Sequence, residues 1–326
     1  SSRFRALNEQ VLLMRGNAPI SLDIHGREHL DTTHHDVMLE AAATSFQIHL
    51  QVAQEQAVRM FNAALIVSAP LVAISANAPY LFGRDLWDES RIPLFEQAVD
   101  VGRDGNKRVT FGNDYVRGTL FSCFEENLEH YPVLLPLNTE DDPARFHHLR
   151  MHNGTIWRWN RPLIDFDPDG TPHIRIENRV IPAGPTIQDM IANAVFFWGA
   201  IQILATLSEA PEFKIPFPVT KQNFYNVARY SLQATIQWLD GELTPVRDIL
   251  MNDLLPMSRK GLERMQIDTN DIDHYLGILE ARVTSGRNGA TWQRNWVQQH
   301  GADMDALSRE YMQRQQTEVP VHEWDV

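Results

Sequence analysis

The chain has 326 residues, 43% of them hydrophobic, so it is long enough to bury a large core in one or two globular domains. Its 29 Lys and Arg residues against 42 Asp and Glu residues give a formal net charge of −13. This balance argues against a nucleic acid or an anionic membrane as a partner, although it leaves room for a local group of arginines in a cleft.

Cys123 is the only cysteine, so the chain cannot form an internal disulfide, and we expect a reducing, cytoplasmic location. A buried structural thiol is the favoured interpretation of Cys123, with a nucleophile as the alternative. The most apolar run, residues 63–76, is shorter than the roughly 20 residues that span a bilayer. We therefore expect no membrane segment. The sequence from Ser1 onward resembles the middle of a longer protein.

The first 80 residues predict a helix, a strand and a second helix. Residues 31–40 predict a helix with His34 and His35 on its surface, because neighbouring helical side chains point about 100° apart and make a poor pair of metal ligands. Residues 54–77 predict a long apolar helix that Pro70 kinks or breaks. Arg84 and Arg91 follow it as candidate site residues, with a structural role as the alternative.

Between these helices, residues 44–52 predict a strand with two distinct faces, because side chains alternate along a strand. The polar face lacks Lys and Glu, which are common on solvated strands, and carries side chains that coordinate or hydrogen-bond. It is therefore predicted to line a site, with a solvated outer face as the alternative. Phe46, Ile48, Leu50 and Val52 form the apolar face, and Ser45, Gln47, His49 and Gln51 form the polar one.

A loop-rich stretch at residues 100–150 suggests a mobile flap or an insertion. Two strands follow at residues 155–162 and 172–182, joined by a turn at residues 167–170, and they predict an antiparallel hairpin. The spaced acidic residues near this turn lack the glycine and the closing glutamate of an EF-hand, so a turn is preferred over a calcium loop. The hairpin would bring Arg161 close to Glu177 and Arg179.

The second of these strands places Arg175, Glu177 and Arg179 on one face. Two guanidinium groups beside a carboxylate suit an anionic ligand, and the carboxylate could hold a metal ion. The alternative is a row of exposed surface ion pairs, which contributes little to stability.

The second half of the chain is mainly helical. A capping box from Thr186 to Asp189 opens a core helix that runs to about Leu207, and a linker with prolines follows at residues 213–218. Residues 221–239 predict a helix, and residues 244–316 predict further helices with breaks at Pro256, 268–270 and 286–289. Asn223, Asn226 and Arg229 share one face of the first of these helices by three- and four-residue spacing.

With no internal repeat and no clear boundary, the chain predicts a single α+β domain over residues 1–326. The expected architecture is an antiparallel sheet with helices packed across and after it. Its apolar helices would suit a homodimer.

Several short motifs in one order resemble the glutamate–cysteine ligase and carboxylate–amine ligase superfamily of the plant and bacterial type, over nearly the whole chain. They are Phe46-Gln47-Ile48-His49-Leu50, Ala76-Asn77-Ala78-Pro79-Tyr80, Arg91, Ile176-Glu177-Asn178-Arg179, and Asn223 with Arg229-Tyr230-Ser231-Leu232. The resemblance implies a glutamine synthetase-like fold with its active site on the concave face of the sheet. It also implies a ligase that uses ATP and Mg²⁺ to join a small carboxylate, such as an amino acid, to an amine.

The resemblance also assigns roles to residues. Glu177 and Gln47 match metal ligands, and Arg179 matches an arginine that touches the transferred phosphate. Arg161 matches a polar active-site position. Polar positions around the nucleotide or the amino-acid substrate are matched by His49, Arg91, Asn223 and Arg229.

One departure from the family pattern bears on catalysis. Family members begin with a strand carrying Gly-x-Glu-x-Glu, whose carboxylates supply most of the metal ligands, and this sequence has no such motif. We expect either that the chain is the C-terminal part of a longer protein or that its metal site is lost. In the second case it would be a non-catalytic member that binds a nucleotide or an amino acid, or acts as a scaffold. The sequence has no Walker A loop and no Gly-x-Ser-x-Gly elbow.

Overall fold

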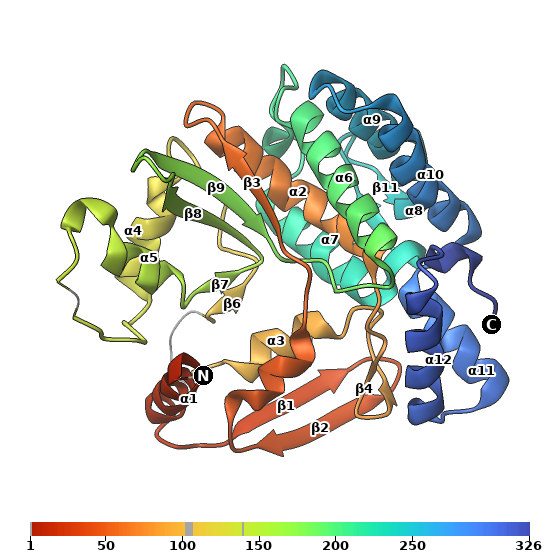
Figure 1. Cartoon of the computed structure of the whole chain (residues 1–326), viewed down its shortest axis with the longest axis horizontal. Coiled ribbons are helices and arrows are strands. Elements are labelled where there is room, and N and C mark those ends of the chain that lie inside the picture. The colour runs from red at the N-terminus through yellow and green to blue at the C-terminus, as the bar shows by residue number, and fades with distance from the viewer. Residues whose placement is uncertain (1, 102–106, 139) are drawn as a thin grey trace.

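The computed structural model describes residues 2–101, 107–138 and 140–326, and Figure 1 traces the chain from end to end. The α-helices are α1 (Ser2–Met14), α2 (Ala57–Ser75), α3 (Arg91–Ala98), α4 (Phe121–His130), α5 (His147–Asn153), α6 (Ile187–Leu204), α7 (Phe217–Tyr230), α8 (Val246–Ile249), α9 (Leu255–Arg264), α10 (Thr269–Ser285), α11 (Gly289–His300) and α12 (Met304–Gln316). The short helices are η1 (Val37–Ala43), η2 (Pro143–Arg145), η3 (Pro211–Phe213), η4 (Ser231–Gln233), a π-helix η5 (Leu250–Leu254) and η6 (Val321–Glu323).

The strands form small sheets, and all of the described pairings except β6–β7 are antiparallel. The strands are β1 (Ile20–His25), β2 (His29–His34), β3 (Ile48–Val52), β4 (Tyr80–Leu81), β5 (Arg84–Asp85), β6 (Val109–Thr110), β7 (Trp157–Arg158), β8 (Asn160–Phe166), β9 (Pro172–Asn178), β10 (Thr235–Gln237) and β11 (Leu243–Pro245). The largest sheet has the order β3–β9–β8. Helices together with small antiparallel sheets confirm the predicted α+β class.

The apolar core lies around α2, which packs against α6 and α7 in the centre of the molecule (Figure 1). Nearly every α2 residue is buried, including Pro70, which lies inside the helix without ending it. Of the two predicted effects of Pro70, a break is therefore wrong, and a kink stays a prediction. The capping box that opens α6 is confirmed, because Thr186 accepts from the Asp189 amide while Asp189 accepts from the Thr186 amide.

Both α2 and α6 are long and apolar enough to cross a membrane by length and composition alone. In the fold, 89% of the α2 window and 67% of the α6 window are buried inside the protein. Burial of this kind is typical of core helices, as the sequence predicted for residues 187–207.

Several predicted boundaries need correction. The helix expected at residues 31–40 is wrong over residues 31–34, which belong to strand β2 and pair with β1, and only the short helix η1 from Val37 onward is helical. The strand expected at 44–52 begins only at Ile48, although Ser45 forms an isolated bridge to Pro182.

In the second half, the strand expected at 172–182 ends at Asn178. The helix expected at 221–239 ends at Tyr230, after which Ser231 adopts a positive φ of 45° and the chain turns into β10. Pro256 does not break the helical run, because α8, the π-helix η5 and α9 follow one another without a gap and Pro256 lies just after the π-helix.

The stretch from residue 100 to 150 is less irregular than expected, because it contains α4, η2 and α5. Residues 102–106 and 139 of that stretch lie outside the described residues. Cys123 is buried on α4, and burial raises the pKa of its thiol to about 11, which supports the structural interpretation over the nucleophile.

Helices α6 and α9 touch through two glycines. A Cβ atom on Gly261 would lie 2.0 Å from the main-chain oxygen of Gly199. Gly261→Ala must therefore push the two helices apart, and we expect a loss of about 2–3 kcal/mol in the free energy of unfolding. The matched control is Gly277→Ala on α10, where an added Cβ meets no atom within 4 Å.

The free energy of unfolding of Gly277→Ala should rise by up to about 1 kcal/mol, because alanine has a higher helix propensity than glycine. Urea denaturation of both variants measures the difference. Equal midpoints for the two variants would contradict the close contact between α6 and α9.

Candidate functional site

A row of polar side chains crosses the β3–β9–β8 sheet. His49, Glu177 and Arg161 are register partners on the three strands. Arg161 donates from Nε to Oε2 of Glu177 at 3.0 Å and from Nη2 to Oε1 at 3.2 Å, and His49 Nε2 lies 3.5 Å from Oε1. The predicted hairpin and the predicted approach of Arg161 to Glu177 are confirmed.

Arg179 and Gln47 extend the row at one end. Arg179 Nη1 lies 3.8 Å from Oε2 of Glu177. With its amide oxygen towards Arg179, Gln47 accepts from Nη2 at 2.9 Å and donates to Oε1 of Glu177 at 3.3 Å. Among the described residues, none accepts a hydrogen bond from the buried Nε and Nη1 of Arg179. Two donors are thus left for a further acceptor.

Burial decides between the two interpretations of this strand face. Glu177 is 3% exposed, and Arg161 and Arg179 are each 8% exposed, so the central group is not a solvated row of surface ion pairs. Arg175 differs, because it pairs with the partly exposed Asp165 instead of Glu177. The strand therefore carries a buried group and a separate, more exposed ion pair.

Burial and the neighbouring charges shift the pKa values of the residues in the buried group. Burial opposes ionisation of Glu177, but attraction to Arg161 and Arg179 outweighs it and holds the pKa of the carboxyl below its usual range. Burial lowers the pKa of Arg179 to about 10, so its guanidinium is still charged at pH 7. Burial also lowers the pKa of His49, which favours the neutral imidazole at pH 7.

Two residues of the site were missed by the sequence analysis. Burial raises the pKa of Glu40 on η1, while the charge of Arg179 acts to lower it, and Oε2 of Glu40 has no hydrogen-bond partner among the described residues. The guanidinium of Arg179 lies over the ring of Phe95 on α3, 5.6 Å from its centroid. No sequence spacing relates these residues to Arg179, which lies more than 80 positions further along the chain. Only the packing of η1 and α3 beside the sheet brings them to it.

The other predicted site residues have structural partners. Arg91 is 3% exposed, bonds Glu89 at 3.1 Å, and donates to the main-chain oxygens of Arg179 and Val180. Arg91 therefore borders the buried row, but its guanidinium already binds these protein acceptors.

Asn223 and Arg229 do not join the row. The Asn223 side chain binds the main chain of Gln237 on β10, at 2.8 and 3.2 Å. Arg229 is exposed and lies 4.6 Å from the ring centroid of Trp87. Their predicted contacts with nucleotide or substrate stay predictions, and the structure gives both residues other partners.

A cavity of about 530 Å³, a volume typical of small-molecule sites, reaches Arg91, and none of the five residues of the row is among its described lining residues. Arg91 forms part of its wall and links it to the main chain of Arg179. Its polar lining includes Asn77, Tyr80, Gln293, Tyr311 and Gln315. This lining offers hydrogen-bond donors and acceptors to a polar ligand.

The described residues around Glu177 do not make a magnesium site. Magnesium prefers several oxygen ligands, whereas both oxygens of Glu177 are held by Arg161 and two guanidinium groups stand within 4 Å. A divalent cation there would be repelled by both arginines. The assignment of Glu177 and Gln47 as metal ligands therefore stays a prediction that this arrangement does not favour.

The lowered pKa of His49 makes a prediction for stability. Since the folded-state pKa lies below the ordinary 6.5, the unfolded chain takes up a proton first as the pH falls, and stability drops below about pH 6.5. His49→Gln removes this loss, so its urea midpoint should fall less between pH 7 and pH 5 than that of the wild type. An equal fall in both proteins would show that His49 contributes nothing to the pH dependence.

Comparison with known protein families gives one match, over most of the chain. Residues 27–313 match the profile of glutamate-cysteine ligase family 2 (GCS2). The matched range includes every residue of the buried row, and it confirms the resemblance drawn from the ordered motifs. The comparison with curated proteins gives no match. The chain belongs to glutamate-cysteine ligase family 2, and this membership implies a carboxylate–amine ligase-like function.

Proposed function

We propose that the protein is an ATP-dependent carboxylate–amine ligase that forms an amide bond through an acyl phosphate. In this reaction class ATP supplies the phosphoryl group that activates the carboxylate, and the amine then displaces phosphate and loses a proton. Family membership supports the reaction class. The carboxylate is that of glutamate or a similar small acid, and the amine is a second small molecule.

The observation that carries the proposal is the buried guanidinium of Arg179, whose Nε and Nη1 have no hydrogen-bond acceptor among the described residues. Bringing a carboxylate to about 4 Å from one phosphate charge costs on the order of 4 kcal/mol at an effective dielectric of 20. A fixed, buried cation reduces this repulsion and stabilises negative charge as it develops on phosphate. Arg161 keeps the Glu177 carboxylate paired, so Arg179 remains available to the substrate anion.

The test is turnover by the wild-type chain. The purified protein is incubated with ATP, Mg²⁺, a panel of amino acids and other small acids, and a panel of amines. Release of ADP and phosphate that requires both an acid and an amine, together with an amide product seen by mass spectrometry, is the expected result. ADP release that needs neither substrate would contradict a ligase.

A second candidate is a member of the family that binds a nucleotide or an amino acid without turnover. It is favoured by one observation, that the carboxylate of Glu177 is held by Arg161 instead of standing free. Calorimetry distinguishes the two candidates. Binding of ATP or an amino acid with no amide product across the panels supports the binding protein, and product formation excludes it.

A further inference from the structure

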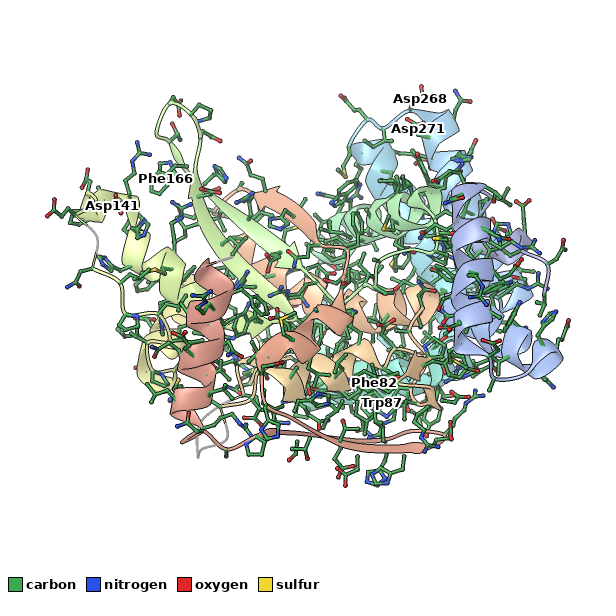
Figure 2. The ribbon with its side chains drawn as sticks, turned by 60° about the horizontal axis from the view of Figure 1, so that its bottom comes forward. Phe82, Trp87, Asp141, Phe166, Asp268 and Asp271 are labelled. Atoms are coloured by element: carbon green, nitrogen blue, oxygen red, sulfur yellow. The ribbon has the colours of Figure 1, made fainter. Side chains whose placement is uncertain are left out.

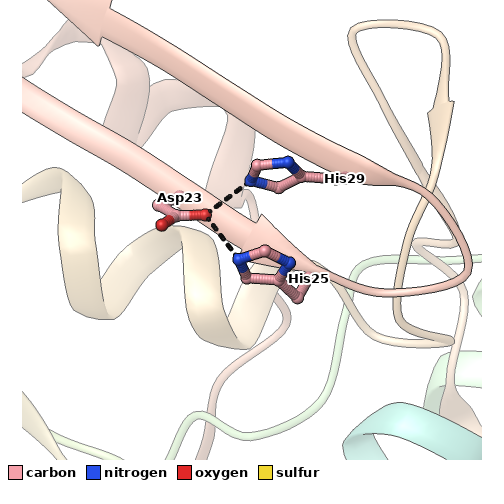
Figure 3. A group of neighbouring side chains, drawn as sticks. All are labelled: Asp23, His25 and His29. Carbon is pink, nitrogen blue, oxygen red and sulfur yellow. Dashed lines mark hydrogen bonds and ion pairs between the residues drawn. The ribbon is translucent and has the colours of Figure 1, made fainter.

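We propose that the β1–β2 hairpin carries a binding site for one divalent transition-metal ion of the Zn²⁺ type, with Asp23, His25 and His29 as ligands. Figure 3 shows the two imidazole rings and the carboxylate pointing towards one another on the hairpin. Two of the three residues precede the range matched by the family profile, which begins at residue 27. The site is separate from the charged row on the β3–β9–β8 sheet and does not depend on the proposed ligase activity.

The strand register brings the three side chains to one face. His25 and His29 are directly paired across the hairpin, and Asp23 lies two residues before His25 on the same face. The opposite face of β1 is buried, because Ile20 and Ile24 belong to the core. Since neighbouring side chains alternate between faces, burial of this apolar face fixes Asp23 and His25 on the outside.

The distances between the candidate ligand atoms are close to those of tetrahedral zinc coordination. His29 Nε2 lies 2.8 Å and His25 Nε2 lies 3.2 Å from the same Asp23 Oδ1, and the three candidate ligand atoms all lie within 4.8 Å of one another. Zinc bonds of about 2.0–2.1 Å place neighbouring tetrahedral ligands about 3.3–3.4 Å apart. The two rings are stacked with centroids 4.0 Å apart and an interplanar angle of 7°. The parallel rings would have to rotate about their side-chain bonds until both nitrogens point at one ion, which their exposure to solvent allows.

The main chain under the ligands is held in place from both sides. Gln97 accepts from the Asp23 amide at 2.8 Å and donates to the Asp23 carbonyl at 3.1 Å. Trp87, which Figure 2 labels beside the hairpin, donates to the His25 carbonyl at 2.8 Å.

The turn of the hairpin is fixed as well. A Cβ atom on Gly26 would lie 2.4 Å from the main chain of Leu86, so the turn packs directly on the segment that follows β5. The Glu28 amide donates to the Asp85 carbonyl at 2.7 Å. A backbone fixed in this way loses little conformational freedom when an ion binds, which favours affinity.

The chemical types of the three ligand atoms indicate which metal ions the site would bind. Two imidazole nitrogens and one carboxylate oxygen suit zinc and its neighbours, whereas magnesium and calcium prefer oxygen ligands alone. All three side chains are at least half exposed, so an ion can enter from solvent and a fourth position is open to water. Asp31, which pairs with Asp23 across the hairpin, adds negative charge on the same exposed face.

The experiment is calorimetric titration of the metal-free full chain with Zn²⁺ in a buffer that does not chelate. The wild type should bind one ion at this site, and Co²⁺ in its place should give the visible absorption of a tetrahedral complex. His25→Ala and His29→Ala should each weaken binding at least about tenfold, because even residues that only support metal ligands contribute 10–100-fold. The double variant should lose the site.

The matched control is His35→Ala, which removes another exposed histidine just beyond β2. It should bind as the wild type does, and circular dichroism should show all variants folded, since the altered side chains are exposed. Unchanged zinc binding by the double variant would overturn the proposal, as would an equal loss in His35→Ala. Either result means an adventitious ion only.

Discussion

Arg179→Ala is expected to reduce amide formation at least about 10²–10³-fold, which is the usual effect of removing one donor that stabilises charge in a transition state. Arg179 is the group in the buried row with donors to spare, so its loss removes the cation that would meet the phosphate. Arg179→Lys keeps the charge but loses the planar pair of donors, and it should recover only part of the activity. Turnover is measured as ADP release together with amide product.

Arg175→Ala is the matched control for this experiment, because it also removes an arginine side chain, from β9 a few residues before Arg179. Its partner is Asp165, outside the buried row, so activity should stay close to that of the wild type. If Arg179→Ala were as active as Arg175→Ala, the proposed role of Arg179 would be wrong. If the wild type forms no product with any substrate pair, loss of ATP or phosphate binding in Arg179→Ala still tests the anion site.

Arg282→Met is expected to lower the free energy of unfolding by about 3–5 kcal/mol, the usual cost of leaving one partner of a buried ion pair alone. Arg282 on α10 is 1% exposed and donates to Asp189 on α6 at 2.7 Å. It also donates to Asn193 Oδ1 at 2.7 Å and to the Ile74 carbonyl at 3.1 Å. The Arg282 side chain thus connects α10 to α2 and α6. Its removal leaves the Asp189 carboxylate buried without that partner.

The control for stability is Arg259→Met, which breaks the exposed pair of Arg259 and Asp273 and should cost less than about 1 kcal/mol. Adding Asp189→Asn to Arg282→Met should restore part of the loss, because it removes the uncompensated charge. Urea denaturation at pH 7 gives all of these values. A midpoint for Arg282→Met equal to that of Arg259→Met would show that the buried pair adds nothing.

The sequence was most informative where one strand carries its own pattern. Alternation alone placed Glu177 and Arg179 on one face, and the turn before β9 identified the hairpin that brings Arg161 to them. These are local signals, because side-chain direction along a strand repeats every two residues. The family resemblance also came from short local motifs, and the family match confirms it.

The features that the sequence patterns did not predict depend on contacts between segments far apart in the chain. Glu40 lies more than a hundred residues before Arg179, in the short helix η1, and its approach to Arg179 comes from the packing of the fold. The β1–β2 hairpin was missed for a related reason, since pairing with β1 overrides the local preference of residues 31–34. Arg91 borders the buried row, but its engagement by Glu89 could be seen only in the fold.

The row of His49, Glu177 and Arg161 shares its register with the core, since Ile48 and Ile176 on the same strands are 2% and 0% exposed. Adding or deleting one residue within β9 would exchange the faces of the residues that follow it, so that Glu177 would point towards the core and Ile176 away from it. Such an insertion or deletion should therefore destroy the fold and the row together. The turn at residues 167–171 lies beyond the paired positions, so loop-length variation there should be neutral. Natural relatives would therefore be expected to differ in length at that loop and to keep the strands that flank it free of gaps.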